Sequence, residues 1–590
     1  MNFIKNVFAT VVGIFLFCVL SFFILIGIGA AFGSSEDEIK INDNSVIEID
    51  LSKIVFDYAG QYKDESPLQT ILAGKEKIGF IEVLNAIKNA KTDNKIKGIS
   101  ILNNQSLLGL AQSKELRNQL EDFKKSGKFV YAYANYFTQK EYYINSVANE
   151  VFVNPAGEVD LKGLGTEVLF FKNFQDKTGL KMEIIRHGKF KSAVEPFLAQ
   201  EMSPENREQL TVLLNSIWKT IAEDIAKSRN ITVAQLNTIA DNLSARTPQM
   251  ALEQKLVDKV AYEDEYHAFL KQKLKVLAKD DYEKVSITDY ASKNAINVDD
   301  LTKDDIVAVI YAQGEINGGE GDVDYIGEGS INRSLKEARE DKDVKAIVLR
   351  VDSPGGNALT SELIWREIEL TKKVKPVVVS MGNLAASGGY YIACGANAIF
   401  AEPTTITGSI GVFGMLPNMS EFATKMGINA EQVSTHKNSN GYSPFEPISD
   451  NYKTFALEGI ETIYKTFVTR VATGRKMTFA QVDAIGQGRV WTGSDALKLG
   501  LVDKIGNLEA AIKHAATLGK SNSYRVENYP EYEKNFNEFL ESLAGAKLYQ
   551  SKEAILKEEL GEENYLLIDN IRKMKKRKGV QAIMPFELIF

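Results

Sequence analysis

Short apolar runs alternate with longer amphipathic stretches along most of the chain. In the second half of the sequence the runs of strand length include Ile306–Ala312, Ala346–Val351 and Val377–Ser380. The stretches with a helical spacing of apolar residues include Ile331–Glu340, Ala358–Lys373 and Tyr452–Thr473, and the last two are long. Apolar strands that alternate with amphipathic helices predict an α/β fold.

The same pattern occurs twice in the sequence. The segment DNKIKGISIL from Asp93 matches DKDVKAIVLR from Asp341, at an offset of 248 residues. The segment YYINSVANEVFVNP from Tyr142 matches YYIACGANAIFAEP from Tyr390 at the same offset. A constant offset of domain size indicates a duplicated globular domain and not a solenoid of short repeats.

We therefore predict two tandem α/β repeats, residues 45–285 and 300–524, with the boundary in the polar stretch near Asp281–Asp304. Residues 525–590 lie beyond the repeats and are predicted to form a charged, helical extension. It contains the basic run Arg572–Lys578 and an apolar end, GVQAIMPFELIF. The basic run is either a solvated helix end or a contact with anionic lipid. The apolar end either enters an active site as a pseudo-substrate or adds an edge strand.

The N-terminal segment predicts a membrane anchor. Residues 7–32 carry no charge over a length that spans a bilayer. Lys5 precedes this segment and acidic residues follow it. The positive-inside rule therefore places residues 1–6 in the cytoplasm and the rest of the chain across the membrane.

Composition narrows the classes of function. The net charge of −8 argues against nucleic acid as the main partner. The two cysteines, Cys18 and Cys394, are too few for a disulfide framework or a multi-cysteine metal site. We expect neither a metal nor a cofactor.

A serine framed by glycines is the first candidate for chemistry. In TTITGSIGVFG, Ser409 follows a strand-like run, and Gly408 and Gly411 let the chain bend and a substrate backbone approach. Upstream, another strand-like run ends in SPGG before a helical pattern, so the Gly355-Gly356 turn is placed to present backbone N–H groups to an oxyanion. Together the two turns predict acyl transfer with Ser409 as nucleophile, although single loops of this kind more often serve packing alone.

The two repeats differ at these positions. At the offset of 248, Ser409 falls opposite Leu161, and Gly355-Gly356 falls opposite Leu107-Leu108. The first repeat carries instead Lys191, in HGKFKSAVEPF. Each repeat thus holds a candidate group that the other lacks.

A serine nucleophile needs a base. The four histidines, His187, His267, His436 and His514, stand in no distinctive stretch. A lysine can replace histidine when burial lowers its pKa toward neutrality. On composition alone, however, Lys191 is one cation among 70 Lys and Arg, and a surface charge is the commoner interpretation.

The motifs together resemble those of a known family. The membrane anchor, two tandem α/β repeats, KSAVEPF in the first repeat, and SPGG, ASGGYYIA and TGSIGVFG in the second are similar to the long, two-domain protease IV form of the signal peptide peptidase A family, peptidase family S49. The resemblance covers roughly residues 45–516. It implies tandem spiral domains of the ClpP/crotonase type behind a transmembrane helix, and a serine protease that cuts signal-peptide remnants with a Ser-Lys dyad.

Carried over by position, the resemblance implies Ser409 as nucleophile and Lys191 as general base. It implies that the oxyanion hole is formed by the N–H groups of Gly356 and Ile410, and the supporting residues are Gly355 and Ser434, the latter orienting the lysine. It further implies extended apolar peptides as substrates and a homotetramer whose sites face an enclosed cavity. The implied location is the bacterial inner membrane, with the catalytic domains in the periplasm.

Two other functions stay open at this point. A crotonase-type enzyme would act on acyl-CoA with polarising N–H pairs and without a serine nucleophile. A catalytically inactive scaffold of the same fold would be retained at the membrane for assembly. An inactive scaffold would be expected to have lost at least one catalytic residue, so the joint presence of Ser409, Lys191 and Gly355-Gly356 argues against it.

Overall fold

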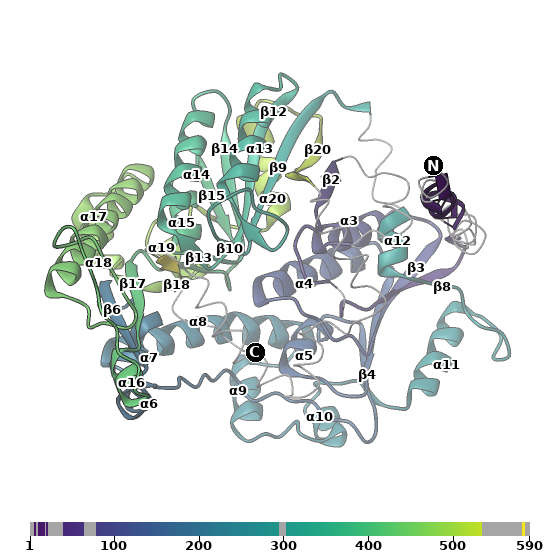
Figure 1. The fold of residues 1–590 in the computed structure, drawn as a ribbon. Helices are drawn as coiled ribbons and strands as arrows, with labels where there is room; N and C mark the ends of the chain where they lie inside the picture. The colour runs from purple at the N-terminus through teal and green to yellow at the C-terminus, as the bar shows by residue number, and fades with distance from the viewer. Residues whose placement is uncertain are drawn as a thin grey trace.

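The computed structural model describes residues 5–6, 10–17, 19–21, 39–52, 54–63, 78–293, 302–533 and 581–583. These residues form two α/β halves, each built around a sheet of mainly parallel strands (Figure 1). In the first half the strands lie in the order β7 (Lys259–Val260), β5 (Glu150–Val153), β4 (Phe129–Ala134), β3 (Ile96–Leu102), β1 (Ser45–Ile49) and β8 (Lys284–Ser286).

The second half repeats this order. Its strands run β19 (Lys504–Ile505), β15 (Ala398–Ala401), β14 (Val377–Ala386), β12 (Val344–Ser353), β9 (Asp305–Gln313) and β20 (Tyr524–Tyr529), and β14 also pairs with β16 (Ile406–Gly408), which pairs with β18 (Val490–Thr492). Strands β3 and β12 begin 248 residues apart, at Ile96 and Val344. The three apolar runs predicted as strands are confirmed as parts of β9, β12 and β14.

Helices cover both sheets. In the first half they are α3 (Phe80–Ala90), α4 (Leu110–Lys124), α5 (Gln139–Asn145), α6 (Lys172–Thr178), α7 (Glu195–Leu198), α8 (Pro204–Arg229), α9 (Val233–Asp241), α10 (Pro248–Glu253), α11 (Glu263–Leu274) and α12 (Ile287–Lys293). In the second half they are α13 (Glu328–Glu340), α14 (Ala358–Thr371), α15 (Gly388–Ala393), α16 (Ser420–Lys425), α17 (Asp450–Arg475), α18 (Phe479–Ile485), α19 (Gly493–Lys498) and α20 (Leu508–Leu518).

The two longest helices, α8 and α17, occupy equivalent places in the repeat and have 26 residues each. Both begin after a serine, Ser203 or Ser449, whose hydroxyl accepts a hydrogen bond from a main-chain N–H of the first turn. Figure 1 shows α8 passing from β6 and α7 toward α5 and α9 of the first half.

A further sheet joins segments from both halves. Its strands lie in the order β11 (Tyr325–Ile326), β10 (Glu315–Ile316), β13 (Gly355–Asn357), β22 (Gln581–Ile583), β17 (Val412–Asn418) and β6 (Lys181–His187). A short ribbon of β2 (Gln61–Lys63) and β21 (Glu531–Glu533) also connects distant parts of the chain.

A buried cluster of charges lies where the two halves meet. Arg350 on β12 forms ion pairs with Asp57, at 2.7 Å, and with Glu115 on α4, at 2.9 Å. All three side chains are almost completely buried. The guanidinium also donates to the Ser380 hydroxyl and to the Met381 carbonyl of β14. The cluster therefore ties the first half to the central strands of the second.

The predicted membrane anchor falls largely outside the described residues. Of residues 7–32, the structure describes 10–17 and 19–21, and these are helical. Within the described part of the chain, no helix is long and apolar enough to cross a membrane. The helical pattern predicted between Tyr529 and Asn570 and the basic run Arg572–Lys578 also lie outside the described residues, apart from 529–533.

Candidate active site

Strand pairing between the halves brings the two candidate groups together. Strand β6 of the first half runs antiparallel to β17 of the second, with His187 opposite Val412. Lys191 follows His187 by one short turn, and Ser409 precedes Val412 by another. The Lys191 Nζ atom lies 3.0 Å from the Ser409 Oγ atom, although the two residues are 218 positions apart in the chain.

Ser409 lies in a strained turn at the end of β16. Its φ of +53° is in the left-handed region, where a side chain other than glycine is disfavoured. Its N–H donates to the Arg489 carbonyl at 2.7 Å, which holds the turn against the segment before β18. The residue is fully buried. The turn predicted around Ser409 is thus present, and the serine itself has the left-handed backbone conformation.

Lys191 is held by close backbone packing. The Phe190 N–H donates to the Gln487 carbonyl at 2.9 Å. A Cβ atom on Gly488 would lie only 2.6 Å from the Lys191 Cβ atom, so this contact requires glycine. The Gln209 side chain on α8 donates to the Ser192 hydroxyl at 3.2 Å and accepts the Val490 N–H at 2.9 Å. The loop that carries the lysine is therefore fastened to both halves.

The surroundings of Lys191 favour its neutral form. The side chain is completely buried, and this desolvation lowers the pKa of the Lys191 ammonium well below its usual value. The centroid of the Phe413 ring lies 5.8 Å from Nζ. Phe413 packs with Val194, Ile184 and Met415 in a small apolar cluster.

The hydrogen bonds of Lys191 match a neutral amine, which has two N–H donors and one lone pair. Nζ lies 2.9 Å from the Ser387 Oγ atom and 3.4 Å from the Ser409 carbonyl, and both atoms accept. Its third contact is the Ser409 hydroxyl. If the two N–H groups point to the first two oxygens, the lone pair faces the Ser409 O–H and can accept its proton.

Ser387 was not among the site residues predicted from the sequence. This residue follows β14 in the ASGG motif, has a φ of +55°, and donates its N–H to the Gly408 carbonyl at 2.8 Å. A serine before two glycines at the end of a buried strand was the available signal. Ser434, which the resemblance suggested as the residue that orients Lys191, is exposed and is not among the hydrogen-bond partners of Lys191 in the described part of the chain.

The SPGG segment adopts a conformation that depends on glycine. Gly355 and Gly356 have φ values of +103° and +156°, and a Cβ atom on Gly356 would overlap the Ile316 carbonyl at 2.0 Å. A Cβ atom on Gly388 would lie 3.1 Å from the Gly356 N atom. A side chain at position 388, next to Ser387, would therefore crowd the Gly356 nitrogen. Ile410, directly after Ser409, is buried, and its carbonyl accepts the Gly488 N–H.

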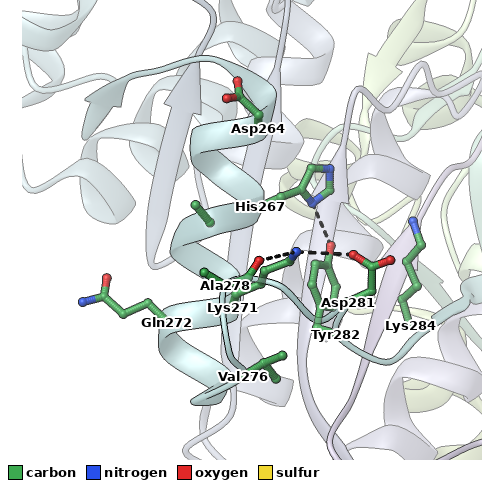
Figure 2. Close-up of a pocket in the computed structure, with 10 residues that line it drawn as sticks. Asp264, His267, Lys271, Gln272, Val276, Ala278, Asp281, Tyr282 and Lys284 are labelled. Carbon is green, nitrogen blue, oxygen red and sulfur yellow. Dashed lines mark hydrogen bonds and ion pairs between the residues drawn. The ribbon is translucent and has the colours of Figure 1, made fainter.

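The histidines lie elsewhere. His187 bonds Glu461, and His436 is exposed beside Thr435. His267 faces a cavity of about 680 Å³ between α11 and the segment that leads to β8, where its Nδ1 atom lies 2.9 Å from the Tyr282 hydroxyl (Figure 2). Neither Ser409 nor Lys191 lines this cavity. No described histidine is hydrogen-bonded to Ser409 as a base would be.

A serine hydroxyl beside a buried amine, in a duplicated α/β fold, is an arrangement that a serine hydrolase can use. The model of peptidase family S49 matches residues 122–277 and 369–522. Protease 4 of Salmonella typhi is 36% identical over 81% of this chain and 78% of its own, and Protease 4 of Haemophilus influenzae is 36% identical over 75% and 73%. The chloroplastic serine protease SPPA of Arabidopsis thaliana is 34% identical over 72% of this chain and 63% of its own.

The chain belongs to peptidase family S49, and it is a serine protease. The family model matches once in each half, in agreement with the duplication observed in the sheets. The acyl-CoA enzyme considered from the sequence is thereby set aside.

Proposed function

We propose that this protein is a membrane-anchored endopeptidase that degrades extended apolar peptides, including cleaved signal peptides, with Ser409 as nucleophile and Lys191 as general base. The observation that carries the proposal is the 3.0 Å contact between Lys191 Nζ and Ser409 Oγ at a completely buried position. Among the described residues, Lys191 has no carboxylate partner. Burial of such an amine destabilises the fold, and a lowered pKa of this kind is typical of a catalytic base.

The proposed cycle begins when neutral Lys191 takes the proton of Ser409 as its oxygen attacks the peptide carbonyl. The N–H groups of Gly356 and Ile410 stabilise the oxyanion, each by about 3–4 kcal/mol in comparable sites. Protonated Lys191 then gives its proton to the leaving amine. Water releases the acyl group from Ser409, again with the lysine as base.

The wider setting is proposed from the resemblance and from the names of the relatives. Residues 1–6 are cytoplasmic, 7–32 form the anchor, and the ClpP/crotonase-type repeats 45–285 and 300–524 lie on the periplasmic side of a bacterial inner membrane, followed by the extension 525–590. A homotetramer is supported by a group of exposed large apolar side chains near α16 and α17. These are Met426, Ile428, Val433, Phe445, Phe455 and Leu457.

The test compares the full chain with its Ser409→Ala variant on an apolar fluorogenic peptide. Wild type should hydrolyse the peptide and be labelled by a fluorophosphonate, and Ser409→Ala should lose both. Ser523→Ala is the matched control, because this serine is exposed and its hydroxyl takes no part in the site. Hydrolysis that survives Ser409→Ala would reject the proposal. Absence of both hydrolysis and labelling from the wild-type chain and from a chain that ends at Val580 would identify an inactive scaffold.

A second prediction concerns Ser387, which we propose as a positioning residue for Lys191. Ser387→Gly should lower kcat by roughly 10- to 100-fold with little change in KM, because a hydrogen bond to an amine that becomes charged is worth about 1.5–3 kcal/mol. Glycine tolerates the positive φ, so the variant removes the hydroxyl without adding strain.

Stopped-flow kinetics across a range of pH should show the acidic limb of kcat/KM displaced in Ser387→Gly relative to wild type. A purely structural role for Ser387 would lower thermal stability and leave the pH profile in place. That result, or a wild-type kcat, would contradict the positioning role.

A further inference from the structure

A segment near the end of the sequence occupies the centre of the sheet that borders the site. Strand β22 runs antiparallel to β13, with Gly355 opposite Ile583, Gly356 opposite Ala582 and Asn357 opposite Gln581. Gln581 also lies opposite Phe413 of β17, again antiparallel. The sequence suggested an edge strand or a pseudo-substrate, and the observed strand is interior.

Both neighbours of β22 belong to the proposed catalytic machinery. Strand β13 contains Gly356, whose N–H we propose as an oxyanion donor. Strand β17 begins at Val412, shortly after Ser409. Among the strands that the structure describes, β22 is the one that lies between β13 and β17 in the sheet order. The space between them is therefore one strand wide, and it is bordered by a strand that begins three residues after Ser409.

We propose that Gln581–Ile583 occupies the binding site of the substrate peptide and holds the protease in a latent state. This inference rests on the proposed function. The ligand class is an extended peptide that adds a strand by main-chain hydrogen bonds and runs antiparallel to both β13 and β17. The same place and direction are then expected for the substrate.

Two further observations support latency. Ser409 and Lys191 have no exposed surface in this arrangement, so a second peptide cannot reach them until something moves. The contact of β22 is also short, with three residue pairs on β13 and one on β17. Strand β6, by comparison, makes seven pairs with β17. A short strand is suited to displacement by a competing peptide.

The first experiment compares the full chain with a variant that ends at Val580. While it is joined to the chain, the β22 segment has an effective concentration of about 1 mM at its binding site. If the free segment binds this site with a dissociation constant of about 0.1 mM, the tethered segment lowers the activity of the full chain about tenfold. The shortened chain should therefore show about tenfold higher kcat/KM on the fluorogenic peptide. The synthetic peptide GVQAIMPFELIF should inhibit it competitively at about 0.1 mM.

A point variant tests the strand without removing it. Ala582→Pro in the full chain removes a main-chain N–H and should raise kcat/KM as truncation does. Ala582→Ser keeps the N–H and should remain latent. If the strand has only a structural role, truncation and Ala582→Pro will lower activity, and this result would overturn the inference.

A cross-link locates the strand independently of activity. In a Cys18→Ala background, Asn357→Cys with Gln581→Cys places two cysteines at paired backbone positions of neighbouring strands, within the Cα separation that a disulfide needs. Oxidation should form the disulfide within one chain and suppress hydrolysis, and reduction should restore it. Asn357→Cys alone is the control, since it shares the loss of the α14 cap.

The outcomes separate the two proposals. Ser409-dependent hydrolysis that is equal in the full and shortened chains would overturn latency and leave the proposed function intact. Absence of Ser409-dependent hydrolysis in the shortened chain would overturn the proposed function, and latency with it. A cross-linked chain that keeps full activity would show that β22 does not block the substrate.

Discussion

A Lys191→Met variant is expected to lose about 10⁴- to 10⁶-fold in kcat, the loss seen when a member of a catalytic serine triad is removed. The Lys191 Nζ atom is the nitrogen base within hydrogen-bond distance of Ser409 Oγ in the described structure. Methionine is similar in length and apolar, so it fills the same buried space. Activity is measured with the apolar fluorogenic peptide under single-turnover conditions.

The Lys191→Met variant should lose activity without losing stability. Because burial lowers the pKa of Lys191 from its usual 10.5, the Lys191 amine binds a proton more tightly in the unfolded chain than in the folded chain. This difference destabilises the wild-type fold at pH 7 and shrinks as the pH rises toward 10.5. Lys191→Met removes it, so its free energy of unfolding at pH 7 should equal or exceed that of wild type.

The pH profile supplies the control on the role of the amine. Wild-type kcat/KM should rise with pH through the lowered pKa of Lys191, since only the neutral amine accepts the serine proton. Lys191→Arg keeps a charge at all accessible pH values and should be as inactive as Lys191→Met. Lys189→Met alters an exposed lysine of the same loop and should retain activity. More than a hundredth of wild-type activity in Lys191→Met would rule out the dyad.

Much of this fold is visible in the sequence because its signals are local. The apolar runs that become β9, β12 and β14 are nearly continuous, as expected for parallel strands buried on both faces. The duplication indicated by the 248-residue offset is also seen in the strand order, which is the same in the two sheets. Ser409 and Gly355-Gly356 stand out because their turns need glycine neighbours.

The contacts within the site could not be predicted in the same way. That Lys191 reaches Ser409 depends on the register between β6 and β17, which are formed by segments from different halves. Ser387 appears in a motif, but its role follows only from the position of an amine far away in the sequence. The place of β22 is likewise a long-range pairing, and a three-residue strand has no periodicity to reveal it.

The ion pairs of Arg350, which bear on stability, are also long-range contacts that the sequence does not predict. In the sequence it is one basic residue in an apolar run, an unusual place for a charge but with no indicated partner. The structure supplies two partners from the other half, Asp57 and Glu115. Such a cluster couples the two halves, and the proposed active site depends on that coupling because its two proposed catalytic residues, Ser409 and Lys191, come one from each half.

Arg350→Met is therefore expected to lower the free energy of unfolding by about 3–5 kcal/mol, the cost of leaving a buried charge without its partner. The reference is Lys88→Met, which breaks the half-exposed pair with Glu509 across the same two halves and should cost no more than about 1 kcal/mol. Urea denaturation of both variants, followed by fluorescence and by circular dichroism, measures the difference.

The pH dependence of this loss identifies its cause. Burial raises the pKa of Glu115, and the Arg350 charge opposes that rise. Without Arg350 the carboxyl takes up a proton more readily, so the deficit of Arg350→Met should be smaller at pH 5 than at pH 8. Adding Asp57→Asn and Glu115→Gln to Arg350→Met removes the unpaired charges and should recover part of the stability. A deficit that is independent of pH and not relieved by these changes would mean that lost packing, and not the charge, is the cause.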